Sequence, residues 1–171
     1  MSVHQGDPAP DFSLPVSGGR TASLAGLRGK PFVLYFYPRA DTPGCTREAC
    51  AFQDALAQLD RIGLTIIGVS RDRLPEIDKF AQKYGLQFPL ASDEDGAVSE
   101  AYGTWIEKTN YGRKYMGMDR ASFLVDKNGR IARIWRRVRV DGHVRQVIEA
   151  AEALVYSSAF CAGPCSSELL E

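Results

Sequence analysis

The sequence predicts a single α/β domain built on a mixed β-sheet with helices on both faces. Two apolar runs rich in β-branched and aromatic residues alternate with segments of helical period. An Asn-Gly turn signal then joins two later strands, and a last helical segment follows. The order strand–helix–strand–helix–hairpin–helix implies a sheet that is parallel at its start and antiparallel at its end. This is the arrangement of a thioredoxin-like fold.

The first half of the chain supplies two strand–helix pairs. The runs "PFVLYFY" at 31–37 and "LTIIGVS" at 64–70 suit buried strands. The segment 44–59 has one apolar face at helical spacing, and the segment 74–85 is a second helix that ends at Gly85. The residues of the first apolar face are Ala49, Phe52, Leu56 and Leu59.

The second half of the chain supplies a hairpin and a final helix. "SFLVD" at 122–126 and "RIARIWR" at 130–136 flank the turn Lys-Asn-Gly. A helix of about 143–155 follows. Beyond it the chain is rich in Ser, Gly and Pro, and the helical period of apolar residues is lost. We therefore predict a thioredoxin-like domain at 1–155 and a flexible C-terminal tail at 156–171.

Composition and charge limit the classes of function. The 171 residues are 44% hydrophobic and 25% charged, which is typical of one soluble core. The formal net charge is zero, which argues against nucleic-acid and membrane-surface partners. We interpret the basic stretch 130–140 as a strand with an outward-facing basic side. The N-terminus has no apolar signal core and no stretch is long enough to span a bilayer, so we expect a cytoplasmic protein.

Two of the four cysteines, Cys45 and Cys50, lie in "YPRADTPGCTREAC" at 37–50. Cys45 falls in the first turn of the predicted helix, where free N–H groups and the helix dipole stabilise negative charge. The thiolate is the nucleophilic form of cysteine. The hydroxyl of Thr42 can point toward the sulfur or toward an oxygen that the sulfur attacks. These features indicate a reactive thiol rather than a buried structural cysteine.

The spacing of Cys45 and Cys50 leaves two possibilities for a disulfide. In a regular helix their Cα atoms would lie roughly 8.7 Å apart, whereas a disulfide needs less than about 7 Å. Either the pair never bonds, or the first helical turn unwinds to let it bond. A structural zinc site would need close pairs such as C-x2-C, and neither this pair nor Cys161 and Cys165 has that spacing. We expect no metal and no cofactor.

The segment at 37–50 resembles the active-site segment of peroxiredoxins of the AhpC/TSA family. The resemblance is specific to the bacterioferritin comigratory protein, or peroxiredoxin Q, subfamily. The family pattern Pro-x3-Thr-x2-Cys falls on Pro38, Thr42 and Cys45. The segments "GDPAPDFSL" near the N-terminus and "GMDRASFLVD" at 117–126 resemble two further family motifs in the same order. The similarity covers the chain up to the predicted tail.

The resemblance implies a thiol-dependent peroxidase that reduces hydrogen peroxide and organic hydroperoxides. Cys45 would be the peroxidatic thiolate and would become a sulfenic acid. Arg120 would stabilise that thiolate and hold the peroxide oxygens. Thr42 would hydrogen-bond the peroxide and the thiolate, and Pro38 would shield the sulfur from solvent. Glu48 would orient an arginine, or would simply complement the helix dipole.

The resemblance also implies how the cycle closes. Cys50 would condense with the sulfenic acid, giving a redox-active Cys45–Cys50 disulfide within one chain. Thioredoxin or glutaredoxin would reduce this disulfide, and the protein would act as a monomer in antioxidant defence and redox homeostasis. Cys161 and Cys165 are either rival resolving thiols or exposed residues of the tail.

Two other classes of function remain as alternatives. The same cysteine pair could serve a peroxide sensor or thiol relay that oxidises a partner protein. Sustained peroxide consumption with a dithiol reductant separates an enzyme from such a relay. A non-catalytic thioredoxin-like binding module is the third possibility, and the combination of Thr42, Cys45 and Arg120 argues against it.

Overall fold

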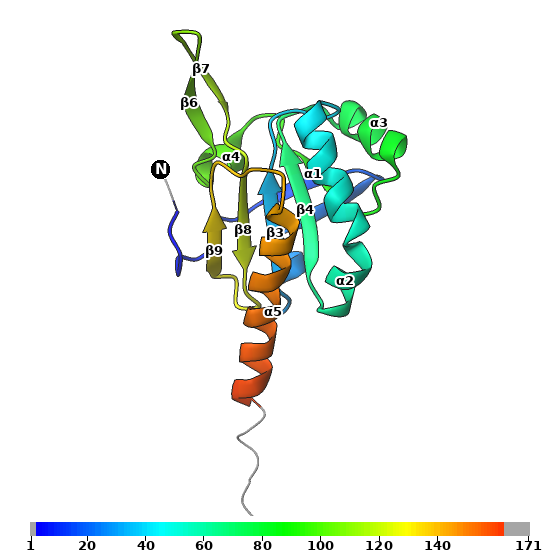
Figure 1. The fold of residues 1–171 in the computed structure, drawn as a ribbon, viewed down its shortest axis with the longest axis vertical. Helices are drawn as coiled ribbons and strands as arrows, with labels where there is room; N and C mark the ends of the chain where they lie inside the picture. Colours follow the sequence, from blue (N-terminus) through cyan, green and yellow to red (C-terminus); the bar gives the residue numbers. More distant parts are fainter. Residues whose placement is uncertain (1–2, 163–171) are drawn as a thin grey trace, which may run out of the picture.

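The computed structural model describes residues 3–162, and the side chains of residues 3–156. Its centre is a sheet of strand order β2-β1-β5-β4-β3-β8-β9. Figure 1 labels β4, β3, β8 and β9 of this sheet side by side. The strands of this sheet are β1 (Ser13–Val16), β2 (Arg20–Ser23), β3 (Phe32–Phe36), β4 (Thr65–Ser70), β5 (Leu90–Ser92), β8 (Ala121–Val125) and β9 (Ile131–Trp135). A separate hairpin pairs β6 (Trp105–Asn110) with β7 (Arg113–Met118).

The helices agree with the predicted ones in position, with one interruption. They are α1 (Pro43–Asp54), α2 (Leu56–Arg61), α3 (Leu74–Tyr84), α4 (Ala97–Ala101) and α5 (His143–Ala162), with a short 3-10 helix, η1, at Ala25–Leu27. The predicted helix 44–59 is interrupted at Ala55 (φ −94°, ψ 2°) and so forms α1 and α2. Helix α3 ends at Gly85, whose φ of 63° is a left-handed conformation that glycine adopts without steric cost.

Strand β3 lies inside the sheet, between β4 and β8. It pairs in parallel with β4, and β4 pairs in parallel with β5. On its other side β3 pairs antiparallel with β8, which in turn carries β9. The predicted mixed sheet, parallel at its start and antiparallel at its end, is confirmed. Every residue of β3 is buried, as expected for a strand with both faces covered.

Helices cover both faces of the sheet, and each face has its own apolar core. On one face α1, α2, α3 and α5 enclose a core in which the rings of Tyr35 and Phe52 stack with centroids 4.7 Å apart. Figure 1 shows α5 crossing in front of this face. On the other face, α4 and the segment before β1 pack against Leu34 and Phe36. Because side chains alternate along a strand, β3 contributes to both cores.

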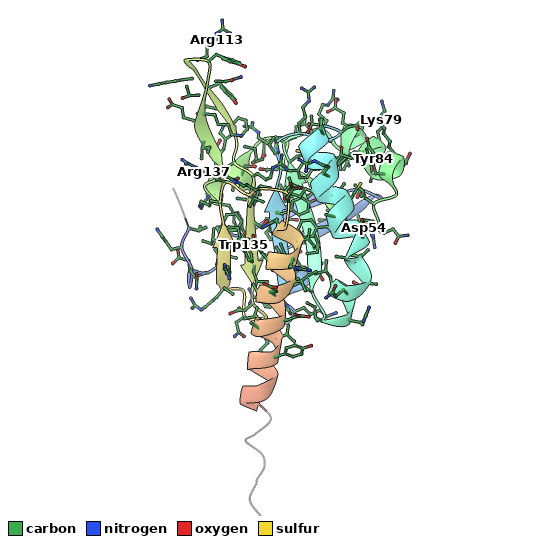
Figure 2. All side chains as sticks on the ribbon, viewed as in Figure 1. Asp54, Lys79, Tyr84, Arg113, Trp135 and Arg137 are labelled. Carbon is green, nitrogen blue, oxygen red and sulfur yellow. The ribbon has the colours of Figure 1, made fainter. Side chains whose placement is uncertain are left out.

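Several short or exposed elements were not predicted from the sequence: β1, β2, β5, α4 and the β6–β7 hairpin. The hairpin projects from the body of the molecule, with Arg113 at its far end (Figures 1 and 2). Most of its side chains are exposed or half-buried, so no alternating apolar pattern marks its strands. Its turn places Tyr111 and Gly112 at φ values of 52° and 78°, where tyrosine gives no recognisable hairpin signal.

Helix α5 extends further than predicted. The expected end near residue 155 was based on the loss of the apolar period, but the backbone stays helical to Ala162. Alanine is a strong helix former and serine is tolerated, so losing an apolar face does not end the helix. The predicted tail at 156–171 therefore overlaps α5, and residues 163–171, with Cys165, lie outside the described residues.

Among the described residues, none of the helices combines the length and apolar character needed to cross a membrane.

Candidate active site

The candidate nucleophile lies where the chain passes from β3 into α1. A loop at 37–42 joins the two elements. Thr42 has an extended backbone, and Pro43 takes the first helical position, where its missing N–H costs nothing. Cys45 follows in the first turn with a relative exposure of only 2%. The free N–H groups of this turn favour a negative charge on the sulfur.

Arg120, the residue just before the neighbouring strand β8, reaches that sulfur. In the β3–β8 ladder Ala121, the first residue of β8, lies opposite Phe36, the last residue of β3. Arg120 therefore lies at the end of the sheet where the chain leaves β3 for α1. The Nη2 of Arg120 donates to Cys45 Sγ at 3.4 Å, and its Nη1 donates to Glu48 Oε1 at 2.7 Å. The structure therefore brings together three predicted site residues, Cys45, Glu48 and Arg120.

Glu48 is a buried acid beside this guanidinium, with a relative exposure of 1%. Burial raises the pKa of its carboxyl group to about 7, against the lowering effect of Arg120. Burial lowers the pKa of Arg120, but Glu48 and Cys45 raise it, and the net shift is upward. The guanidinium thus keeps its charge. The other carboxyl oxygen, Glu48 Oε2, has no hydrogen-bond partner among the described residues.

Within the same part of the chain, no three His, Cys, Asp or Glu side chains gather as a metal site.

Gly44 leaves the space that Arg120 occupies. A Cβ atom built on Gly44 would lie 3.2 Å from Arg120 Nη2, the same nitrogen that donates to the sulfur. That separation is tighter than an ordinary van der Waals contact, so the guanidinium would have to shift by a few tenths of an ångström to admit a side chain here. This role of Gly44 could not be predicted from the sequence, because the close contact involves Arg120, which is far away in the chain.

Thr42 and Pro38 lie close to Cys45 in the chain, on the loop that leads into α1. The Thr42 hydroxyl donates to the carbonyl oxygen of Arg39 at 2.7 Å. Its single proton is therefore committed to the loop, and its oxygen can only accept from another group. Pro38 is exposed at the start of the loop. Cys45 itself belongs to the buried core cluster that also contains Phe52.

Cys50 lies on the same helix as Cys45 and is half-buried. Both thiols are free in this structure. Burial, and then the nearby carboxylate of Asp54, raise the pKa of the Cys50 thiol. Because both residues lie within α1, the helical separation of roughly 8.7 Å between their Cα atoms applies. A bond between them requires the start of α1 to unwind.

The loop before α1 is held by contacts that the sequence did not indicate. Asp41 adopts a left-handed φ of 61°, which aspartate tolerates better than most residues. Its carboxylate accepts hydrogen bonds from Lys83 Nζ at 2.9 Å and from Tyr84 Oη at 2.8 Å. The backbone N–H of Ala40 donates to Asp72 Oδ2 at 2.7 Å. These contacts fix the loop to α3 and to the end of β4.

Comparison with known proteins places this chain in a family. The AhpC/TSA family matches residues 5–134 of the chain. The chain is 42% identical over 149 residues to "Peroxiredoxin Bcp" of Bacillus subtilis, covering 87% of this chain and 95% of that protein. It is 41% identical over 138 residues to "Peroxiredoxin Bcp" of Escherichia coli, covering 81% and 88%. A solved structure of the Xanthomonas campestris bacterioferritin comigratory protein superposes with a TM-score of 0.81 at 39% identity, covering 84% of this chain and 92% of that one.

The fit of Arg120 over Gly44 predicts the effect of adding one methyl group. Gly44→Ala should slow alkylation of Cys45 by iodoacetamide about tenfold, if it weakens a hydrogen bond worth about 1.4 kcal/mol. The helix preference of alanine over glycine, about 1 kcal/mol, offsets most of that loss, so the free energy of unfolding should change by less than about 1 kcal/mol. Rates would be measured in a Cys50→Ser background, with urea unfolding in parallel. If the contact with Arg120 is the cause, Gly44→Ala should not change the alkylation rate in an Arg120→Ala background. An equal loss of rate in that background would contradict this account.

The raised pKa of Glu48 predicts a pH-dependent stability. Between the reference value of 4.5 and about 7, the folded state holds a proton that the unfolded state releases. The free energy of unfolding should therefore fall as pH rises through this window, by up to about 1.4 kcal/mol per pH unit from this group. Glu48→Gln should remove this part of the slope, measured by urea unfolding across the window. Glu149→Gln, at an exposed position of α5, is the matched control. Parallel profiles for wild type and Glu48→Gln would rule the assignment out.

Proposed function

Because the chain belongs to the AhpC/TSA family and is a peroxiredoxin of the Bcp, or peroxiredoxin Q, type, it is a thiol peroxidase, and we propose that Cys45 is its peroxidatic residue. The observation that carries this proposal is the 3.4 Å contact between Arg120 Nη2 and Cys45 Sγ at the start of α1. A fixed positive charge and a helix N-terminus both favour the thiolate over the thiol.

In the proposed first step, the Cys45 thiolate attacks the terminal oxygen of a hydroperoxide. An S–O bond forms and the O–O bond breaks, so sulfur is oxidised to a sulfenic acid and the peroxide is reduced to an alcohol or water after the leaving oxygen takes a proton. The planar guanidinium of Arg120 can meet the negative charge that develops on that oxygen. Its bond to Glu48 fixes the direction in which it points.

Thr42 and Pro38 have supporting roles in this proposal. Since the Thr42 hydroxyl already donates to Arg39, its oxygen is available to accept the O–H of a bound hydroperoxide. This would orient the terminal oxygen toward the sulfur. Pro38, exposed at the start of the loop, would limit access of water once substrate is bound. Hydrogen peroxide and organic hydroperoxides are the proposed substrates, and the Xanthomonas relative is described as having alkyl peroxide reduction activity.

In the proposed second step, Cys50 attacks the sulfenic acid of Cys45. The new S–S bond forms as the S–O bond breaks and the sulfenic oxygen leaves as water, so the Cys50 thiol and the Cys45 sulfenic acid become one disulfide. The first turns of α1 unwind to bring the sulfurs together. Unwinding also removes Cys50 from the half-buried site that raises its thiol pKa, so the attacking thiolate becomes easier to form.

A dithiol reductant closes the proposed cycle. Thioredoxin or glutaredoxin would attack the Cys45–Cys50 disulfide, take up the oxidising equivalents as its own disulfide and return both thiols. After reduction, α1 refolds and Cys45 is buried against Arg120 again. In this proposal the protein works as a cytoplasmic monomer in antioxidant defence.

This cycle predicts different losses for the two cysteines. Cys45→Ser should abolish peroxide consumption, because serine cannot carry the oxidised sulfur. Cys50→Ser should consume about one equivalent of peroxide and then stop when only thioredoxin is supplied, because no disulfide forms. Peroxide loss would be followed with a thioredoxin system in excess. The control is the double variant Cys161→Ser/Cys165→Ser, which should retain turnover. Sustained consumption by Cys45→Ser would contradict the proposal.

A further inference from the structure

We propose that Asp119 is a positioning residue that holds Arg120 in reach of Cys45 through the backbone of the segment after β9. The inference rests on the proposed role of Arg120. Arg120 lies in the short gap between the end of β7 at Met118 and the start of β8 at Ala121. It is therefore outside both named strands, and its backbone must be fixed by other contacts.

Those contacts converge on Asp119 and on Arg120 itself. The N–H of Asp119 donates to the carbonyl of Thr104 at 2.7 Å. The carbonyl of Arg120 accepts the N–H of Val138 at 2.9 Å. The Asp119 side chain, with a relative exposure of 5%, accepts the N–H of Arg137 through Oδ1 at 3.1 Å. Asp119 thus holds Arg137, and the next residue, Val138, holds the backbone of Arg120.

The conformation of Arg137 explains why this carboxylate matters. Its φ of 49° is left-handed, and such a conformation costs a non-glycine residue about 1 to 2 kcal/mol. The hydrogen bond from its N–H to Asp119 offsets that cost. Without it the segment can relax toward an ordinary conformation, and the N–H of Val138 would leave the Arg120 carbonyl. Figure 2 shows Arg137 at the end of the sheet below the hairpin.

Arg136 ties the same carboxylate to the turn after α4. Its guanidinium lies 3.9 Å from Asp119 Oδ2 and donates to the carbonyls of Gly103 and Tyr102, each at 3.2 Å. The next residue in that turn, Thr104, supplies the carbonyl that accepts from Asp119. Two segments distant in the sequence are therefore joined at one buried carboxylate. Such a junction can hold a guanidinium to within the few tenths of an ångström that a functional contact requires.

The test compares two changes that both remove the negative charge of Asp119 and of which only one keeps an acceptor oxygen. Asp119→Asn keeps an oxygen that can accept from Arg137, whereas Asp119→Ala removes it. In a Cys50→Ser background we would measure the ultraviolet absorbance of the Cys45 thiolate against pH and the rate of reaction with hydrogen peroxide. We expect Asp119→Ala to lower the rate about tenfold and to move thiolate formation to higher pH, from the loss of one hydrogen bond. Asp119→Asn should stay within about threefold of wild type.

A rescue variant keeps the test informative if Asp119→Ala is poorly folded. Glycine adopts the left-handed conformation at residue 137 without steric cost. Asp119→Ala combined with Arg137→Gly should therefore recover most of the lost rate. A merely structural role would lower the stability of Asp119→Ala, measured by urea unfolding, with no change in the pH profile of the thiolate. That result, or equal effects of the alanine and asparagine changes, would overturn the inference.

One further variant separates this inference from the proposed function. If Arg120→Ala leaves the thiolate profile and the peroxide rate unchanged, the proposed role of Arg120 fails. If Arg120→Ala alters both but Asp119→Ala alters neither, only the role of Asp119 fails. When both roles hold, Asp119→Ala adds no further loss in an Arg120→Ala background.

Discussion

The buried contact between one guanidinium and two groups of α1 is the constraint on which the rest of the site depends. Arg120 donates to both Cys45 and Glu48; these two residues are buried, and the Arg120 side chain is only 18% exposed. A charge in such a place is costly unless its partners are fixed. The strand order of the sheet fixes these partners, because β8 lies directly beside β3. The β3–β8 ladder ends where the chain leaves β3 for α1. The fold thus aligns two segments about seventy residues apart in the sequence.

The same turn of α1 has to satisfy two opposed requirements in the proposed cycle. Attack on a peroxide needs the turn folded, with Cys45 buried against Arg120. Disulfide formation with Cys50 needs it unwound. The structure limits how far unwinding can spread, because Asp41 is held to α3 on one side and Phe52 stacks on Tyr35 on the other. The segment between these anchors can open while the sheet and the remaining helices stay in place.

The sequence was sufficient for the parts of the molecule that follow a repeating pattern or a motif. The buried strands and the helix start at Cys45 came from apolar period and turn chemistry, and Arg120 came from a family motif. Glu48 had two interpretations, and only its distance to Arg120 favours an orienting role. Gly44 and Asp119 gave no local signal, because each acts on a residue that folding alone brings near. The exposed hairpin and the extension of α5 were missed because neither carries an apolar period.

Mapping the disulfide that forms on oxidation tests the central claim most directly. The fully reduced protein would receive one equivalent of hydrogen peroxide, its remaining thiols would be blocked, and tryptic peptides would be examined by mass spectrometry without reduction. Trypsin cleaves after Arg47, so the peptides of Cys45 and Cys50 separate unless a disulfide joins them. The account predicts a Cys45–Cys50 link. A link from Cys45 to Cys161 or Cys165, or an unoxidised Cys45, would contradict it.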